Sequence, residues 1–308
     1  MRVAIVTGAS GFIGQAVVKE LLRNNYRVYA VIRKHFESEV FSYEHCIPVV
    51  CDLDNLSNLS KELGSVPGAL FFHFAWSGTS GLDRADTVLQ LKNVQWTIDA
   101  LRIAKSLKCS RFIGAGSIME DETTAAVRTQ GSKPGLGYVY GSGKLVAHAM
   151  AKSIATSIDL DFIWTYITNA YGVGEFSPRL INSTIRKCIK GEVPEFTSGK
   201  QNYDFVYIDD VARAFRLIGE RGKPFCEYLI GSGEARPLKE FLQQMNESIA
   251  PHLKFLFGNV PFTGVNLPLS TFDTSLTERD TGFKAKVTFE EGCKRTFSWW
   301  KDQLEQVG

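Results

Sequence analysis

The segment MRVAIVTGASGFIGQAVVKELLRNNYRVYAVIR, residues 1–33, reads as a strand, a glycine-rich turn, a helix and a second strand. Residues 3–6 are apolar, as expected of a parallel strand that is buried on both faces. Gly8, Gly11 and Gly14 follow at a G-x-x-G-x-x-G spacing, and apolar residues then recur at helical spacing. The chain therefore turns sharply from a buried strand into the N-terminus of a helix.

This turn is suited to a phosphate group. Glycines let the backbone approach a ligand closely, and the free amide groups and positive dipole end of a helix favour an anion. A tight turn without a ligand could carry the same glycines, but the preceding strand and the following helix are the context that a dinucleotide fingerprint requires. We therefore expect contacts with a dinucleotide cofactor from Gly8, Ser10, Gly11, Phe12, Ile13 and Gly14.

Predicted strands alternate with predicted helices along the first half of the chain. The strands are expected at residues 26–32, 47–51, 69–74, 111–115 and 161–166. This alternation favours an α/β fold with a doubly wound parallel sheet.

Three further segments are predicted to form helices. The longest covers residues 82–107, and the others cover 179–190 and 289–304. The apolar spacing of the long helix predicts an inner stripe that consists of Val88, Leu91, Val94, Ile98, Leu101 and either Ile103 or Ala104.

The composition is that of an ordinary soluble globular protein: of 308 residues, 44% are hydrophobic and 22% are charged. A net charge of +2 without a concentrated Lys/Arg run gives no case for a nucleic-acid partner, so we expect a small molecule. The apolar runs are too short to span a bilayer and the chain enters a strand almost at once, so we expect no membrane segment, no secretory signal and a cytoplasmic location. Six cysteines without a C-x-x-C pair argue against a metal site and a disulfide framework.

Four segments together resemble one family. TGASGFIG at residues 7–14 resembles the signature of the short-chain dehydrogenase/reductase superfamily, in particular its extended branch, the NAD-dependent epimerase/dehydratase family. HFAWSG at 73–78, GAGS at 114–117 and YGSGK at 140–144 follow in the order and spacing of that family. DFVYIDDVA at 204–212 resembles the segment with which the family returns to its main domain.

The resemblance implies a Rossmann domain with a smaller C-terminal substrate-binding lobe. We expect the dinucleotide-binding domain to comprise residues 1–167 and about 205–231. The substrate-binding lobe then comprises residues 168–204 and 232–308. A homodimer through a two-helix face is common in the family and is expected here.

The end of the second strand bears on the choice of cofactor. An Asp or Glu there would accept hydrogen bonds from the adenosine ribose of NAD(H), whereas an Arg accommodates the 2'-phosphate of NADP(H). This chain has no acid at that point and has Arg33 instead. A basic residue after a strand can also belong to a solvated loop, but we expect NADP(H) in preference to NAD(H).

The resemblance places further residues beside the cofactor. Asp52 and Leu53 would lie along the adenine, although Asp52 can equally be a helix N-cap. Asn93, on the long helix, would brace the sheet near the cofactor. The segment after the fourth strand would pass beside the cofactor through Phe74, Ala75 and Trp76, and we expect Ser77 and, further along the chain, Asn169 to contact the substrate.

Tyr140 and Lys144 are four residues apart, so on a helix they project from one face. A tyrosine with an ordinary pKa of ~10 is a poor base at neutral pH. A nearby ammonium group stabilises the phenolate, so we expect Lys144 to lower the pKa of Tyr140 and also to anchor the nicotinamide ribose. Ser117, at the end of the fifth strand, would orient the same substrate oxygen. Tyr138 has a serine four residues on and is the weaker candidate.

Departures from family patterns bear on the reaction. The 4,6-dehydratases usually follow the catalytic hydroxyl residue with Asp-Glu, and here Ile118 and Met119 follow Ser117, which argues against elimination although three acids come next at 120–122. Many nucleotide-sugar epimerases carry an Arg before the DFVY segment to hold the diphosphate, and here that residue is Tyr203. The cations that could replace it are Arg179, Arg186, Lys187 and Lys200.

The leading prediction is a nucleotide-sugar epimerase or 4-ketoreductase that moves hydride between a nicotinamide cofactor and a sugar carbon, expected to be C4. One alternative is an NADPH-dependent carbonyl reductase of a non-sugar substrate, which the missing Arg allows. Another is a cofactor-sensing regulator without catalysis, against which the intact Ser, Tyr and Lys set argues.

Overall fold

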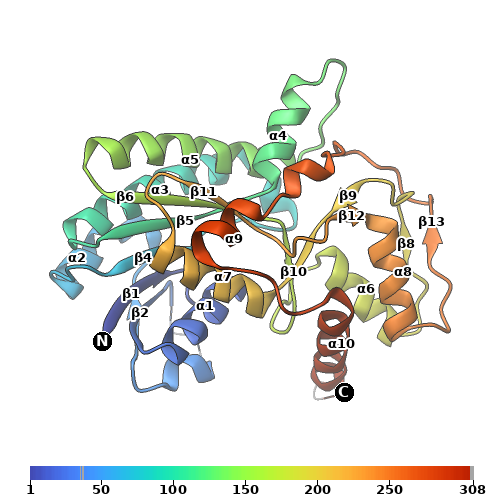
Figure 1. The fold of residues 1–308 in the computed structure, drawn as a ribbon, viewed down its shortest axis with the longest axis horizontal. Helices are drawn as coiled ribbons and strands as arrows, with labels where there is room; N and C mark the ends of the chain where they lie inside the picture. Colours follow the sequence, from blue (N-terminus) through green and yellow to red (C-terminus); the bar gives the residue numbers. More distant parts are fainter. Residues whose placement is uncertain (35, 37, 306–308) are drawn as a thin grey trace.

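The computed structural model describes residues 1–34, 36 and 38–305. Seven parallel strands form the main sheet, in the order β11-β6-β5-β4-β1-β2-β3 (Figure 1). They are β1 (Arg2–Thr7), β2 (Tyr26–Ile32), β3 (Cys46–Val50), β4 (Leu70–His73), β5 (Arg111–Ser117), β6 (Asp161–Ile167) and β11 (Glu227–Ile230). Their buried apolar runs suit a sheet that is covered on both faces. The predicted doubly wound α/β fold is confirmed.

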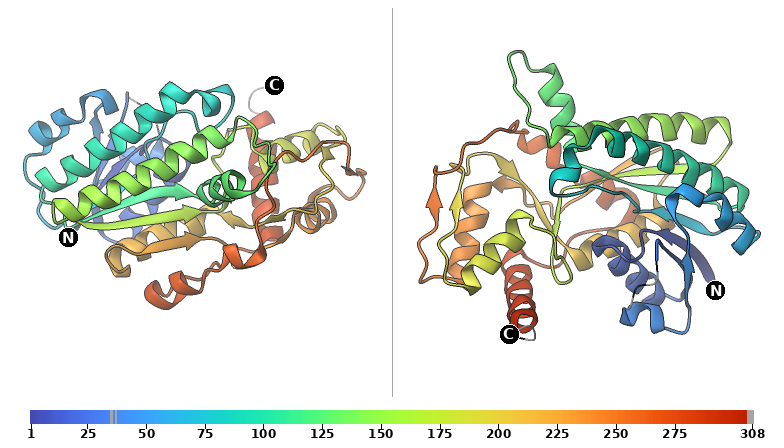
Figure 2. Two further views of the ribbon diagram at one scale, coloured as in Figure 1. Left: turned by 90° about the horizontal axis from the view of Figure 1, so that it is seen from above. Right: turned by 180° about the vertical axis from the view of Figure 1, so that it is seen from behind.

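Helices cover both faces of this sheet and create two hydrophobic cores. On one face α1 (Phe12–Arg23) packs against α7 (Ile208–Arg221), and on the other α3 (Thr87–Ser106) packs against α5 (Tyr138–Ser157). α2 (Ser57–Leu63) lies against α3, and α4 (Met119–Arg128) against α5. The views in Figure 2 show these layers from above and from behind.

The later chain forms smaller elements beyond the carboxyl ends of the strands (Figure 1). α10 (Phe289–Glu305) packs against α6 (Leu180–Ile189) and α8 (Leu238–Ile249). Two-stranded pairs join β7 (Asn169–Tyr171) to β10 (Phe205–Tyr207), β9 (Asn202–Tyr203) to β12 (Arg236–Pro237), and β8 (Glu195–Phe196) to β13 (Leu256–Phe257). Short 3-10 helices are η1 (Glu39–Ser42), η2 (Leu53–Asn55), η3 (Leu82–Ala85) and η4 (Leu269–Phe272).

One late helix lies away from this group. α9 (Ser275–Thr281) packs against α7 and β11, at the edge of the main sheet. The segment after residue 231 therefore contacts both parts of the molecule, and the division into a Rossmann domain and a substrate lobe stays a prediction.

The helix predicted over 82–107 is interrupted. Asp86 separates η3 from α3, and its carboxylate accepts hydrogen bonds from the amides of Val88 and Leu89 at 2.9 and 3.0 Å. This is an N-cap, which satisfies amides that have no partner within the helix. The long-helix prediction was wrong at this point.

The predicted inner stripe of α3 is right for its second half only. Val94, Ile98 and Leu101 are buried, but Val88 and Leu91 are 74% and 64% exposed. The first turns of α3 instead bury Gln90 and Asn93, whose side chains bind the loop after β4. The hydrogen bonds that this loop forms therefore decide which residues are buried in the first turns of α3, and the apolar spacing does not.

Other expectations agree with the structure to within a few residues. β5 runs two residues beyond its predicted end, to Ser117, and α1 starts at Phe12, between the second and third glycines of the turn. α6 starts at Leu180, with Arg179 in the N-cap position. The six cysteines are free thiols, and Cys226 alone among them is not fully buried.

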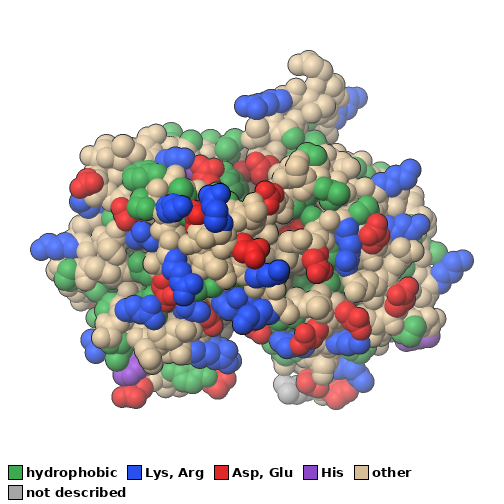
Figure 3. Space-filling model, in the orientation of Figure 1, with side chains coloured by type: hydrophobic (Ala, Val, Ile, Leu, Met, Phe, Trp, Pro, Cys, Tyr) green, Lys and Arg blue, Asp and Glu red, His purple; other side chains and the backbone are tan. Residues whose placement is uncertain are grey.

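On the face drawn in Figure 3, acidic and basic side chains are interspersed. Among the helices of residues 1–34, 36 and 38–305, none combines the length and apolar character that a bilayer crossing needs.

Candidate active site

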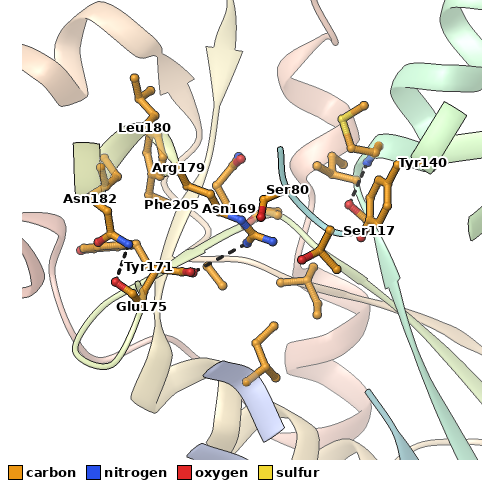
Figure 4. A pocket seen from close by; sticks show the side chains of 18 of the residues that line it. Ser80, Ser117, Tyr140, Asn169, Tyr171, Glu175, Arg179, Leu180, Asn182 and Phe205 are labelled. Atoms are coloured by element: carbon orange, nitrogen blue, oxygen red, sulfur yellow. Dashed lines mark hydrogen bonds and ion pairs between the residues drawn. The ribbon is translucent and has the colours of Figure 1, made fainter. Parts of the chain in front are cut away.

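A cavity of about 360 Å³ opens at the carboxyl ends of β5 and β6. Ser117, Tyr140, Asn169 and Arg179 line it, together with Ile13 from the start of α1 (Figure 4). The carboxyl edge of a parallel sheet is where open α/β folds bind ligands. Ile13 of the glycine turn therefore borders the same cavity as Ser117 and Tyr140, whereas Lys144, the third predicted catalytic residue, is not part of the lining.

The three glycines of the turn have different surroundings. Gly8 has a φ of +69°, and a Cβ there would lie 2.7 Å from the Ala75 amide nitrogen. A Cβ at Gly14 would lie 2.1 Å from the Gly8 carbonyl oxygen. Gly11 is exposed, and its Cβ would approach the same oxygen only to 3.2 Å. The chain itself requires glycine at 8 and 14, whereas at position 11 the open side of the turn is left for a ligand.

The loop after β4 is held in place by α3. The Asn93 carboxamide accepts from the Ser77 amide at 2.8 Å and donates to the Ser77 carbonyl at 2.9 Å. Gln90 accepts from the Trp76 indole at 2.8 Å and donates to the Gly78 carbonyl at 3.0 Å. Asn93 thus braces the loop that was expected to pass the cofactor, and Gln90 is a brace that sequence reasoning missed.

Lys144 is buried between this loop and β5. Its Nζ donates to the Ala115 carbonyl oxygen at 2.7 Å and lies 3.7 Å from the centre of a Trp76 ring. Burial lowers the pKa of Lys144 to about 7, although the Glu120 carboxylate opposes this shift. The ammonium group is therefore fixed in position, and part of the population is neutral at neutral pH.

Tyr140 faces the cavity, and its electrostatic partners differ from those expected. Burial raises the pKa of Tyr140, and the guanidinium groups of Arg179 and Arg84, with the Ser117 hydroxyl, act to lower it. Lys144 Nζ lies 5.9 Å from the Tyr140 ring centre, whereas the Arg84 guanidinium lies 4.8 Å from it. Two arginines are thus the cations that act to lower the pKa of Tyr140, and the expected effect of Lys144 on that pKa stays a prediction.

Tyr138 is engaged elsewhere. Its hydroxyl accepts a hydrogen bond from the Val265 amide at 2.9 Å, which ties the start of α5 to the late chain. The choice of Tyr140 over Tyr138 agrees with these surroundings, and the catalytic role of Tyr140 stays a prediction.

The acids after Ser117 have separate surroundings. Glu120 is 1% exposed and accepts from the Ser117 amide at 2.9 Å and from the Trp164 indole at 3.1 Å, so its carboxylate is occupied inside the protein. Glu122 instead lines the cavity, where burial raises its pKa to about 7 and Arg84 opposes the rise. Sequence reasoning did not single out Glu122 or Arg84, because neither belongs to a family motif.

The predicted cofactor residues that do not line the cavity include Arg33, Asp52, Leu53 and Phe74. Arg33 is exposed just after β2, and the Asp52 carboxylate caps η2 by accepting from the Asp54 amide at 2.9 Å. Leu53 follows Asp52, and Phe74 packs edge-on against Phe215 at 4.6 Å between ring centres. The N-cap reading of Asp52 is confirmed, and the contacts of these four residues with a cofactor stay predictions.

The predicted substrate contacts are divided. Asn169 lines the cavity and donates from its side chain to the Asp204 carbonyl at 3.0 Å. Ser77 is hydrogen-bonded to Asn93 and does not line the cavity. Thr79 and Ser80, further along the same loop, line it instead. Of the four cations proposed to replace the missing Arg, Arg179 lines the cavity.

The model of the NAD dependent epimerase/dehydratase family matches residues 4–231. The chain belongs to this family. It is therefore an enzyme of the extended short-chain dehydrogenase/reductase type, whose members depend on NAD. The resemblance read from the motifs is confirmed.

Relatives with related activities cover most of the chain. A CDP-abequose synthase of Salmonella typhimurium is 26% identical over 82% of this chain and 83% of its own length. A dTDP-glucose 4,6-dehydratase of Haemophilus influenzae is 23% identical over 96% of this chain and 97% of its own.

The fold is shared with solved structures. The structure of UDP-glucose 4-epimerase from Thermotoga maritima with UDP-glucose has a TM-score of 0.81 at 19% identity, covering 99% of this chain and 100% of that one. MoeE5 in complex with UDP-glucuronic acid and NAD has a TM-score of 0.78 at 25% identity, with the same coverage.

The glycine turn of this family member fits a dinucleotide. A side chain is sterically barred at Gly8 and Gly14, and the exposed Gly11 begins α1, whose first amides are free to face a phosphate. Gly8, Ser10, Gly11, Phe12, Ile13 and Gly14 would hold the pyrophosphate.

Replacement of Gly11 by valine should separate ligand binding from folding. The Cβ of Gly11→Val meets the protein at 3.2 Å, so we expect an intact fold but at least about tenfold weaker cofactor binding, equivalent to ~1.4 kcal/mol. Fluorescence titration with NADH and NADPH measures the affinity, and circular dichroism checks the fold. Gly14→Val is the matched control and should unfold, because its Cβ would lie 2.1 Å from a carbonyl oxygen. Unchanged affinity in folded Gly11→Val would show that no phosphate approaches this turn.

Proposed function

We propose that this enzyme moves hydride between a nicotinamide cofactor and C4 of a nucleotide-sugar, as an epimerase or a 4-ketoreductase. The observation that supports this most directly is that Ser117 and Tyr140 line one cavity with Ile13 of the glycine turn. Relatives named as a 4-epimerase and as a CDP-abequose synthase agree with it. Elimination is not proposed, because Ile118 and Met119 take the positions after Ser117.

Each residue has a distinct part in the proposed mechanism. The bound nicotinamide supplies the hydride chemistry. Tyr140 takes the proton of the C4 hydroxyl or returns it, and the Ser117 hydroxyl orients that oxygen. Arg84 and Arg179 favour the phenolate form of Tyr140. Lys144, held by Ala115 and Trp76, would bind the nicotinamide ribose.

Arg179 is the proposed replacement for the diphosphate-binding Arg that Tyr203 displaces. Figure 4 shows its guanidinium near the middle of the cavity beside Ser80, with Ser117 and Tyr140 on the facing wall. Its ion pair with Glu175 is loose, at 3.9 Å, so donors remain for a phosphate. Arg186, in contrast, stacks on the Trp300 ring at 5.0 Å.

A second cavity of about 400 Å³ would receive the nucleoside. It shares Met119, Glu122, Leu180 and Tyr203 with the first cavity. Its wall includes the aromatic rings of Tyr138, Phe196 and Phe262, which suit a planar base. A substrate with its sugar at Tyr140 and its diphosphate at Arg179 would reach this space.

Replacement of the Tyr140 hydroxyl tests the proposed chemistry. Tyr140→Phe should lower turnover of an accepted nucleotide-sugar by about 100- to 10,000-fold, because general acid-base catalysis is lost. Cofactor affinity and the melting temperature should change little. Tyr138→Phe is the matched control and should retain turnover, since its hydroxyl bonds to Val265. Near-normal turnover in Tyr140→Phe would exclude this phenol from the reaction.

Arg33 supports a preference for NADP(H) over NAD(H), which in turn favours the reductase. Arg33→Ala should weaken NADPH binding by about 10- to 100-fold, the 1.5 to 3 kcal/mol of a charge-assisted contact, and leave NADH binding unchanged. Titration of both cofactors into both proteins measures this. Equal losses for the two cofactors, or a wild-type preference for NADH, would count against it. NAD retained through purification would favour an epimerase instead.

We also propose a homodimer through α3 and α5, which lie side by side (Figure 2). The two helices expose Val88, Leu91 and Met150, the last of them by 52%. Wild-type protein should sediment as a dimer, and Leu91→Lys should sediment as a folded monomer because a charge would be buried at the interface. Val127→Lys, on the exposed side of α4, is the control. A monomeric wild type would refute the proposal.

A further inference from the structure

Arg84 is a cation at the acid/base end of the cavity that the proposed mechanism leaves without a ligand. It lies on η3, between β4 and α3, and η3 packs against α5. Its side chain lines the cavity, and its guanidinium lies 4.8 Å from the Tyr140 ring centre. An anion bound by Arg84 would therefore lie beside Tyr140.

The guanidinium of Arg84 is poorly satisfied by the protein. Within the described part of the chain it forms no ion pair and its side chain donates no hydrogen bond. Its Nε is buried and lacks a partner. A buried donor without a partner destabilises the folded protein, and native proteins rarely keep one that serves no purpose. Arg179, in contrast, has Glu175 at 3.9 Å.

The nearby acid does not cancel this charge. Glu122 shares the cavity wall with Arg84, but no ion pair joins the two side chains in the described structure. Burial raises the pKa of Glu122 to about 7, so part of its population is neutral at neutral pH. Arg84 therefore presents net positive charge to the cavity.

We propose that Arg84 binds a carboxylate at C5 of the sugar, so that the preferred substrates are nucleotide-linked hexuronic acids. This rests on the proposed function, which puts C4 at the Tyr140 hydroxyl. The diphosphate leaves the ring at C1, across from C4, and is accounted for by Arg179 and the second cavity. C4 is flanked by C3, which carries a neutral hydroxyl, and by C5, whose substituent becomes an anion when C6 is oxidised to a carboxylate. A guanidinium beside Tyr140 is placed to meet that anion. A carboxylate there replaces a hydroxymethyl group and adds little bulk to a cavity of about 360 Å³.

The geometry of arginine suits this ligand. Its planar fork of donors matches the two oxygens of a carboxylate, and the bond is charge-assisted. Binding would also give the unpartnered donor of Arg84 an acceptor.

The test compares sugars that differ only at C6. The proteins are saturated with oxidised cofactor, and KM, kcat and calorimetric affinity are measured with UDP-glucose and UDP-glucuronate, and with the corresponding dTDP pair. Wild type should bind the uronic acid about 10- to 100-fold more tightly than the neutral sugar, the range of one charge-assisted hydrogen bond. Arg84→Met keeps an unbranched apolar stem but removes the guanidinium, so it should abolish this preference by raising KM for the acid. Arg84→Lys should restore part of it.

Arg279→Met is the matched control, because that arginine is 69% exposed on α9, away from the cavity lining. It should leave both substrates unaffected. If Arg84→Met lost affinity equally for the acid and the neutral sugar, the proposal would be overturned and Arg84 would be assigned to the diphosphate. A fall in kcat alone, equal for both sugars, would overturn the proposal and show that Arg84 acts on Tyr140 instead of on a substrate carboxylate. Turnover of both sugars by wild type without preference would overturn the inference and leave the proposed function standing. If wild type bound neither sugar, both the inference and the proposed function would be overturned.

Discussion

The buried carboxylate of Glu120 joins the elements that meet at the active site. A charge with 1% exposure persists only when its oxygens are hydrogen-bonded, and here the donors are the Ser117 amide on β5 and the Trp164 indole on β6. His148 on α5 lies 3.5 Å away and stacks on the Trp164 ring. Gly116 makes room for the contact, because a Cβ there would lie 2.5 Å from the carboxylate. The end of β5, and with it Ser117, is thereby fixed relative to α5.

Burial raises the pKa of Tyr140, and the cations that oppose this rise are two guanidinium groups. Lys144 is held by a carbonyl oxygen and an aromatic face, and burial lowers its pKa to about 7. Arg84 and Arg179 remain charged under all ordinary conditions and lie on elements from distant parts of the sequence. Proton affinity at Tyr140 is thus coupled to the same guanidinium groups that are placed to meet a substrate.

Local patterns predicted the sheet and the motifs well, because buried strands and a glycine turn leave few alternatives. The strand, turn and helix within residues 1–33 could be predicted directly from the sequence. The position of Tyr140 near the start of a helix, α5, could be predicted in the same way. Predictions failed where a distant segment decides what a side chain faces. Gln90 is buried where it forms hydrogen bonds with the loop after β4, and Arg84 lines the cavity from η3, which the sequence predicted as part of one long helix. Arg179 could be named only as one of four cations until α6 was placed.

The glycine turn also shows that a motif can combine positions kept for different reasons. Contact with its own backbone forbids a side chain at Gly8 and Gly14 with or without a cofactor. At the exposed Gly11 the constraint is weaker, because a Cβ would lie 3.2 Å from the Gly8 carbonyl oxygen and needs only a small shift of the turn. A descendant of this fold that gave up its dinucleotide would still need the first and last glycine, while the middle one could drift. Among proteins of this architecture, the residue at the middle position is therefore the informative marker of whether a nucleotide is still bound.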